Sequence, residues 1–377
     1  MPTPSWRTLP ALHEAALPGG PASDHPFTQT AFLQGLETCG CVGPGTGWQP
    51  RHLLLEQGAR RALLPTYSKT DSSGEYVFDH AWAAAYQRHG LRYFPKLVTA
   101  VPFTPVPGPR LLLPEGESAS LWLSDVFTAM RERVIQEQAS GWHALFVPED
   151  WLPAASEAGL LTRAGCRFHW QNPGYRDFSD FLDTLTSKKR KDIRRERRLL
   201  AEKGIRCRVQ SGRDISPADT GFFVDCYTRT YHEHGQHPYL NLAFFQHLFR
   251  SMPDQVLLVT AEDDAGPMAS ALFLHDQTTL YGRYWGCLRR ADGLHFELCY
   301  YLGMEICMQR GLSDFDPGTQ GEHKLLRGFA PRLTHSLHWL KEPAFHDAVS
   351  RFVEEERNQV ERYCEDAANH LPYRNNG

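Results

Sequence analysis

Three strand-like runs, separated by turn residues, dominate the second half of the chain and restrict what it can fold into. The runs are residues 255–261, 268–275 and 279–285, and the linkers EDDAGP and HDQT are rich in turn-forming residues. A helix-like segment, residues 295–311, and a short strand-like segment, residues 313–315, follow. This order predicts an antiparallel meander continued by a helix and another strand, which together form a mixed sheet covered by helices.

The first half repeats a similar α/β order. Strand-like segments at 51–64, 91–100 and 142–147 alternate with helix-like segments at 119–138 and 151–165. A chain of 377 residues is too long for one ordinary core, so we predict two domains. The predicted division is a loose leader at 1–28, an N-terminal domain at 29–168, a C-terminal domain at 169–342, and a C-terminal helix and tail at 343–377.

Composition and cysteine usage narrow the class of protein. Hydrophobic residues make up 41% and charged residues 22%, as in ordinary folded domains. The sequence contains no run of 18 apolar residues, the length that a membrane span requires. The N-terminus lacks the pattern of a secretory signal, so we expect a cytoplasmic protein. Nine scattered cysteines without a CxxC pair predict reduced thiols. The histidines of HEHGQH, residues 232–237, fit a polar loop better than a metal site, so none is predicted.

A strongly basic segment contrasts with the formal net charge of −4. Eight of the eleven residues from 188 to 198 are Lys or Arg, and the segment 188–203 reads as a helix with Ser187 as N-cap and Gly204 after its end. One interpretation is a solvated helix whose acidic residues offset the repulsion. The other is a surface that binds the phosphates of RNA, a coenzyme or a substrate, through Lys188, Arg190, Lys191 and Arg194.

A loop between the last meander strand and the next helix is a second candidate anion site. A helix N-terminus after a strand favours anions. The segment Arg290-Ala-Asp-Gly293-Leu-His295 matches all but the last position of the [RQ]-x-x-G-x-[GA] loop that holds pyrophosphate in acetyltransferases of the GNAT class. Arg289 adds a second cation, and Glu297 in the first turn either favours the helix dipole or acts as a general base.

The segment DFDPGTQGEHKLLRGF, residues 314–329, gathers more polar residue types than a solvated loop needs. It follows a strand, where site residues often collect. His323 is a candidate base for an amine proton near neutral pH, with Glu322 beside it. The remaining candidates, expected to contact substrate, are Asp316, Gln320, Lys324 and Arg327.

Two further groups of residues complete the prediction. Glu75, Tyr76, Asp79 and Lys96 in the first half either line a cleft for substrate or belong to hairpin tips and edge strands. An oxyanion formed during acyl transfer needs a hydrogen-bond donor, for which a backbone N–H of the meander, Tyr281 or Tyr284 is a candidate.

Several long segments resemble the FemAB-like family of the GNAT-fold acyltransferase superfamily. They are KKRKDIRRERR, LYGRYWGC, LHFELCYY, GTQGEHKLLRGF, GEYVFDHAW and YFPKLVTAVPFTPVPGPRLL, and the resemblance runs from about residue 25 to about residue 355. The basic segment is also similar to a pattern of Fem peptidyltransferases, carried here by Lys188, Arg190, Ile193, Arg194 and Gly204.

The resemblance implies two tandem GNAT-like α/β (α+β) domains, each with a mixed, largely antiparallel sheet flanked by helices. It implies an N-acyltransferase that forms an amide, with acyl-CoA or aminoacyl-tRNA as co-substrate and no tightly bound cofactor. The acceptor is then an amine-bearing small molecule or peptide, with a peptidoglycan precursor among the candidates. The chain lacks the long helical arm of some Fem enzymes, which leaves direct tRNA contact open. The alternative is a non-catalytic protein that recognises a peptidoglycan precursor or RNA on a degenerate GNAT pair.

Overall fold

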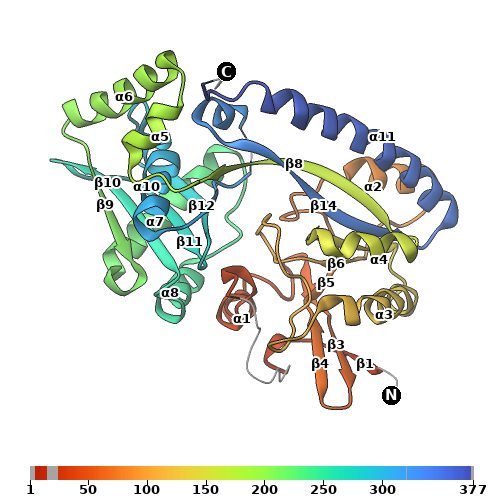
Figure 1. Cartoon of the computed structure of the whole chain (residues 1–377). Coiled ribbons are helices and arrows are strands. Elements are labelled where there is room, and N and C mark those ends of the chain that lie inside the picture. The colour runs from red at the N-terminus through yellow and green to blue at the C-terminus, as the bar shows by residue number, and fades with distance from the viewer. Residues whose placement is uncertain (1–4, 15–23, 320, 375–377) are drawn as a thin grey trace. The chain divides into compact units, whose positions relative to one another are not determined.

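The computed structural model describes residues 5–14, 24–319 and 321–374, and the chain divides into two compact units (Figure 1). The N-terminal unit comprises Met1–Cys166 and Leu333–Arg362, and the C-terminal unit comprises Arg167–Arg332 and Tyr363–Gly377. Each unit therefore takes its main body from one half of the sequence and a smaller part from the end of the chain.

The sheet of the C-terminal unit contains the predicted meander. Strands β9 (Arg206–Ser211), β10 (Val256–Asp263), β11 (Gly266–His275) and β12 (Thr279–Cys287) pair antiparallel in this order. Strand β13 (Asp314–Asp316) pairs parallel with β12 and antiparallel with the end of β8 (Leu161–Gln171). A parallel pair requires a crossover connection, which the helical segment between β12 and β13 supplies.

Helices cover both faces of this sheet, and its central strands are therefore buried on both sides. Leu257 and Val259 of β10 belong to a core cluster shared with helices α5 (Phe178–Thr184), α6 (Ser187–Glu202) and α10 (Leu302–Arg310). Helix α7 (Pro217–Glu233) packs on β11 and β12 and against α8 (Leu242–Ser251). The near-continuous apolar runs of β10 and β11 follow from this double cover.

The N-terminal unit has a sheet with the same sequence of pairings. Strands β2 (Trp48–Pro50), β5 (Thr66–Lys69) and β6 (Lys96–Thr99) pair antiparallel, β6 pairs parallel with β7 (Gly141–Val147), and β7 pairs antiparallel with β14 (Ala330–Leu340). A separate sheet joins β1 (Ser5–Leu9), β3 (His52–Gln57) and β4 (Arg60–Leu64). Its α-helices are α1 (Thr30–Thr38), α2 (His80–Arg88), α3 (Leu123–Gln136), α4 (Leu152–Glu157) and the part of α11 (Pro343–Ala368) that ends at Arg362.

Several predicted boundaries differ from the structure. Residues 5–9 were assigned to a loose leader but form β1, which pairs along its length with β3. The helix predicted over 151–165 ends at Glu157, and β8 begins at Leu161, because Gly159 adopts a left-handed φ of 68° that ends the helix. The strand predicted over 91–100 is limited to β6, and the N-cap of α6 is Thr186 rather than Ser187.

The close approach of α7 to β12 depends on Gly286, and this gives a test of the packing. A Cβ on Gly286 would lie 2.0 Å from the backbone oxygen of Cys226 in α7. Gly286→Ala should therefore lower the free energy of unfolding by about 1–3 kcal/mol, because the helix must move away from the strand.

The matched control for this substitution is Gly221→Ala within α7. No atom lies within 4 Å of a Cβ built at Gly221, so this change should stabilise the helix by roughly 0.5–1 kcal/mol. Chemical denaturation of both variants measures the difference. Equal stability of Gly286→Ala and the unmodified chain would contradict the packing described.

Within the described residues, no helix combines the length and the apolar character needed to cross a bilayer.

Candidate active site

Strand β12 pairs with its parallel neighbour β13 only over the first third of its length. Its pairing with β13 covers only Thr279–Tyr281, opposite Asp314–Asp316, while β12 continues to Cys287. On the other side the register skips Arg283, since Leu272 faces Tyr284 and Phe273 faces Gly282, so β12 carries a β-bulge at this point. Bulges disrupt the ladder locally and are frequent beside active sites. Beyond Tyr281, no strand of the described residues pairs with this side of β12, and Pro317 and Gly318 approach Gly282 there.

A cluster of histidine and aromatic rings lies next to this edge. Trp285 of β12 contacts the ring of His295 at 4.9 Å between centroids, and His295 lies 6.1 Å from His323. The phenol oxygen of Tyr300 lies 2.8 Å from Nε2 of His323. His323 belongs to the 3-10 helix η7 (Glu322–Arg327), which follows β13, so two segments that flank β13 in sequence supply the cluster.

A π-helical turn brings Tyr300 and His295 together. The helix after β12 begins as α9 (Leu294–Phe296), continues as a π-helix over Glu297–Tyr301, and becomes α10. The wider π turn places residues five apart on the same face, and the rings of His295 and Tyr300 are 5.2 Å apart. Gly321, with φ 104°, also matters because a Cβ there would lie 2.1 Å from the His323 ring.

Both imidazoles are neutral at pH 7. Burial lowers the pKa of His295 to about 4, and the charges of His323, Lys324 and Arg327 act in the same direction. Partial burial also lowers the pKa of His323 below 6.5, assisted by Lys324 and Arg327. A neutral imidazole at hydrogen-bonding distance from a tyrosine can accept a proton from an amine, and of the two rings His323 is the less buried.

Buried charges hold the turn that carries His323. Nζ of Lys324 donates to the carbonyl oxygens of Gly318 and Thr319 at 2.7 and 3.1 Å, and burial lowers its pKa to about 8 although Asp316 opposes the change. Asp316 accepts from Arg167 at 2.8 Å and from the Gly318 N–H at 2.9 Å. Burial alone would raise the pKa of Asp316, but Arg167 holds it below its usual value. These two candidates therefore support the loop rather than face an open surface, since each is about 1% exposed.

Glu297 lies in a different environment from His323. Its two carboxylate oxygens accept from Arg197 of α6 at 2.8–3.1 Å, and Arg197 also binds Glu305. Burial raises the pKa of Glu297, and Arg197 opposes this rise. The arrangement is that of a buried ion pair joining α6 to the helix after β12. Glu322, by contrast, is exposed and accepts from the Tyr363 hydroxyl at 3.2 Å.

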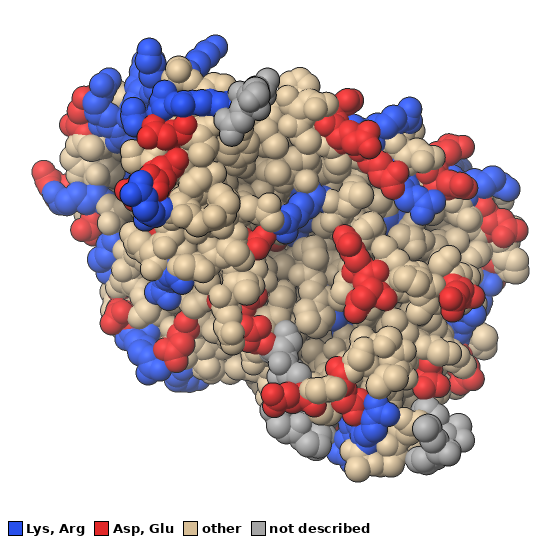
Figure 2. Space-filling view, viewed as in Figure 1, with Lys and Arg blue, Asp and Glu red and all other residues tan. Residues whose placement is uncertain are grey.

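Helix α6 presents an open positive surface. Figure 2 shows Lys and Arg side chains gathered at the upper left, where Figure 1 places α6. Only Ile193 and Leu200 are buried. Arg190 pairs with Asp183 at 2.8 Å. Within the described part of the chain, no ion pair is formed by Lys188, Lys189, Lys191, Arg194 or Arg195.

Ion pairs neutralise the two arginines of the loop after β12. Arg289 binds both carboxylate oxygens of Asp263 at 2.6 and 2.7 Å, and Arg290 binds Glu233 at 2.9 Å. Gly293 adopts a left-handed φ of 83° immediately before the helix, and its Cα side faces Glu196 and Leu200 of α6 at about 4 Å from a built Cβ. The loop and α6 are thus neighbours.

Two other candidates lie outside the histidine cluster. The ring of Tyr284 packs on Tyr227 and Phe245, on the side of α7 and α8, whereas its neighbour Trp285 contacts His295 on the opposite face. The structure therefore does not bring Tyr284 to His323. Tyr281 donates to Asp276 at 2.8 Å. Gln320 lies outside the described residues.

The candidates of the N-terminal unit form a buried ionic cluster. Nζ of Lys96 donates to Glu75 at 2.8 Å and also contacts Asp79, and the hydroxyl of Tyr93 donates to Asp79 at 2.5 Å. All four side chains are at most 4% exposed. Tyr76 follows Glu75 in a left-handed conformation with φ 61° and is half-buried. Residues His143 and His338 extend the cluster, with their Nδ1 atoms 2.8 Å apart.

Two residues that matter in the C-terminal unit were not predicted from the sequence: Tyr300 of the histidine cluster and Arg197, which binds Glu297. Tyr300 was not predicted because the π-helical turn that aligns it with His295 has no recognised sequence signal. Arg197 was hidden among the other cations of α6. Among the described residues, no group of three or more His, Cys, Asp and Glu side chains is placed to hold a metal ion.

Comparison with known proteins supports the fold and a broad class. Residues 2–375 match the model of the FemAB-like family, which is described as peptidoglycan biosynthesis/recognition. No curated protein matches the chain.

Solved structures resemble the chain at low sequence identity. The crystal structure of FemX is 9% identical, with a TM-score of 0.51 covering 88% of this chain and 96% of FemX. A conserved protein of unknown function from Bacteroides thetaiotaomicron is 11% identical, with a TM-score of 0.52 covering 86% of this chain and 93% of that one. A tandem GNAT protein from the clavulanic acid biosynthesis pathway is 11% identical, with a TM-score of 0.43. The match covers 90% of this chain and 99% of that one. The predicted fold class, two tandem GNAT-like domains with mixed sheets, is confirmed.

Proposed function

We propose that this chain, which belongs to the FemAB-like family, is an N-acyltransferase that passes an acyl or aminoacyl group from an anionic donor to an amine. The observation that carries the proposal is the position of His323, an imidazole bound to Tyr300 in a ring cluster that Trp285 of β12 joins through His295. The donor is acyl-CoA or aminoacyl-tRNA, and the acceptor is an amine-bearing small molecule or peptide. The family's description makes a peptidoglycan precursor the first acceptor to test.

The reaction follows from the groups present. The amine nitrogen attacks the donor carbonyl carbon while His323 takes the amine proton. The oxyanion that forms accepts a hydrogen bond from a backbone N–H at the bulged edge of β12. The bond from carbon to the sulfur or oxygen of the leaving group then breaks, and the leaving group takes the proton that His323 received from the amine. No covalent enzyme intermediate is needed. We place the reaction in the cytoplasm, where both kinds of donor are made.

Donor binding by the purified full chain tests the proposal directly. Acetyl-CoA and a mixed aminoacyl-tRNA pool would each be titrated across a range of salt concentrations, and amide formation would be followed with amine acceptors that include muropeptides. Saturable binding with transfer from either donor supports the proposal. Binding of muropeptides without transfer from either donor would instead identify a recognition protein.

The basic surface of α6 gives a separate prediction. The triple variant Lys188→Gln, Lys191→Gln, Arg194→Gln removes three exposed cations that have no ion-pair partner in the described part of the chain. If an RNA donor lies along α6, its affinity should fall and the slope of log affinity against log salt should flatten by roughly 2–3. Glu297 and Arg197 remain intact, so the fold should be unaffected.

The control for this triple variant is Arg250→Gln, which removes an exposed cation from α8. It should leave the salt slope unchanged. A slope that is equal in the triple variant and the unmodified chain would show that α6 does not hold phosphates, and the helix would then be a solvated, self-paired surface.

A further inference from the structure

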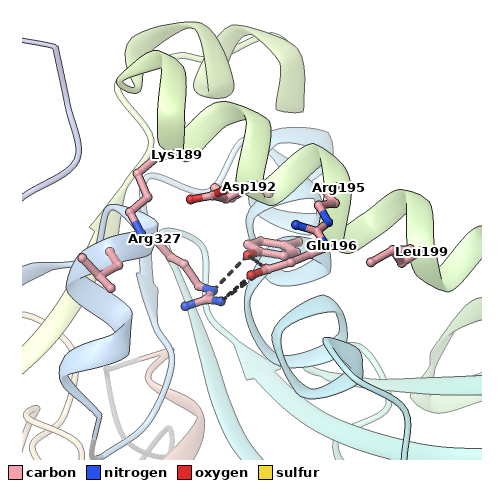
Figure 3. A pocket seen from close by; sticks show the side chains of 9 residues that line it. Lys189, Asp192, Arg195, Glu196, Leu199 and Arg327 are labelled. Atoms are coloured by element: carbon pink, nitrogen blue, oxygen red, sulfur yellow. Dashed lines mark hydrogen bonds and ion pairs between the residues drawn. The ribbon is translucent and has the colours of Figure 1, made fainter.

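A pocket of about 250 Å³ lies between α6 and the 3-10 helix η7 of the C-terminal unit (Figure 3). Figure 3 shows Lys189 and Glu196 extending from α6 toward Arg327 of η7. This space is slightly smaller than the pockets of about 300–1,000 Å³ that take drug-sized ligands. The pocket therefore suits one ring system with part of its sugar.

The walls of the pocket include apolar side chains that remain accessible. Leu199 of α6 is 39% exposed and Leu326 of η7 is 43% exposed, and both line the pocket with the buried Ile193. Large exposed apolar side chains that line one concave site from two different elements form a slot for a flat, weakly polar group.

The charged groups of the pocket fall into two sets. Both oxygens of Glu196 are occupied, because Arg327 donates to them and the Tyr301 hydroxyl binds one of them. This set forms the floor. The other set is Lys189, Arg195 and Asp192, for which the described residues provide no ion pair. The pocket thus offers two cations and one carboxylate to a ligand.

We propose that this pocket binds the adenosine phosphate end of the donor. The adenine ring lies between Leu199 and Leu326, its exocyclic amine donates to Asp192, and a neighbouring phosphate binds Lys189 and Arg195. A fatty chain would leave Asp192 unused, and an acidic peptide would leave the apolar slot unused. The inference rests on the proposed function, since CoA contains an adenosine phosphate and tRNA ends in one.

The pocket borders the candidate active site through Arg327. The guanidinium carbon of Arg327 lies 3.4 Å from the centroid of the Phe296 ring, and Nη1 donates to the backbone oxygen of His323 at 3.1 Å. A nucleoside in the pocket is therefore one side chain away from the candidate base. This position fits a terminal adenosine whose ribose carries the acyl ester, as in aminoacyl-tRNA. With acyl-CoA, the pantetheine arm would have to span the distance from the pocket to His323.

Nucleotide binding to the purified full chain tests the inference, with AMP as the probe and IMP and UMP, whose bases lack an exocyclic amine, as comparisons. AMP should bind saturably and more tightly than IMP or UMP. Leu326→Glu should weaken AMP at least tenfold, because it places a negative charge in the slot at an exposed position. Lys189→Gln should weaken AMP several-fold, while Lys203→Gln, an exposed cation at the end of α6 and outside the pocket, should have no effect.

The same variants separate the two sources of adenosine. CoA and an uncharged tRNA with or without its terminal adenosine would be titrated against the unmodified chain and Leu326→Glu. Loss of CoA affinity in the variant, or loss of the preference for the complete tRNA, supports the inference and names the source. Equal affinities of the unmodified chain for AMP, IMP and UMP, no AMP binding at millimolar concentration, or a Leu326→Glu variant with unchanged AMP affinity would each overturn it.

Acyl transfer distinguishes failure of this inference from failure of the proposed function. If His323→Ala abolishes transfer while Leu326→Glu leaves both transfer and nucleotide binding unchanged, the pocket assignment is wrong and the enzyme assignment stands. If AMP binds in the pocket as described but no acyl group is transferred, the pocket assignment stands alone.

Discussion

Replacing His323 by alanine is expected to lower the rate of acyl transfer by about 10²–10⁴-fold, the usual contribution of a general base. The physical reason is that His323 is the base that lies at hydrogen-bonding distance from Tyr300. Within the described part of the chain, no second neutral, half-exposed base is bound to Tyr300. Donor affinity should change little, because the phosphates bind elsewhere. Initial rates with a saturating donor measure the effect, and circular dichroism checks the fold.

The pH dependence of the reaction should identify the same residue. A base must be unprotonated to act, so the rate falls as the pH drops through its pKa. Burial, with Lys324 and Arg327, places the pKa of His323 below 6.5, and the acid limb of kcat/KM should therefore lie below pH 6.5. In His323→Ala this limb should disappear.

A matched substitution controls for loss of an imidazole in general. His234→Ala removes an exposed histidine after α7 and should leave the rate and the acid limb unchanged. An acid limb that persists in His323→Ala would show that the proton goes to a different group, and the role assigned to His323 would be wrong.

The fold was predictable where the usual patterns hold. The meander β10–β12 has apolar runs with turn residues between them, and the helix after it ends at Gly311, which adopts the expected left-handed φ of 69°. Strand β14 was missed because its buried positions include Thr334, Ser336 and His338, which are polar. Strand β8 was mistaken for helix over its first residues for a similar reason, since arginine and histidine interrupt its apolar pattern.

The candidate site was predictable only in part because it depends on tertiary contacts. The loop that carries His323 and Lys324 was recognisable from its density of polar residues. The roles within it follow from burial and partners, which sequence does not supply: Lys324 binds backbone carbonyls, and Glu297 is held by Arg197. Charged residues in such a segment therefore stabilise the loop as often as they take part in the reaction.

Replacing Lys96 by methionine is expected to destabilise the chain by about 3–5 kcal/mol, the usual cost of removing one partner from a buried ionic cluster. Lys96 is the cation that neutralises Glu75 and Asp79, and none of the three side chains is more than 4% exposed. Burial alone would raise the pKa of Asp79, and Lys96 holds it below its usual value, so removing Lys96 leaves a buried carboxylate that must stay unpaired or bind a proton. Chemical denaturation at pH 7 measures the loss.

The comparison variant Glu75→Gln should cost much less, because Lys96 keeps Asp79 as its partner. Burial raises the pKa of Glu75 from 4.5 to about 7, with Asp79 adding to the rise and Lys96 opposing it. Between these two values folded Glu75 binds more protons than unfolded Glu75, so the contribution of Glu75 to stability should fall as the pH rises from about 4.5 to 7. The difference in stability between the unmodified chain and Glu75→Gln should therefore shift against the unmodified chain over this range. A difference that does not change with pH, or Lys96→Met and Glu75→Gln variants of equal stability, would mean that solvent reaches the cluster and that its charges are not buried as described.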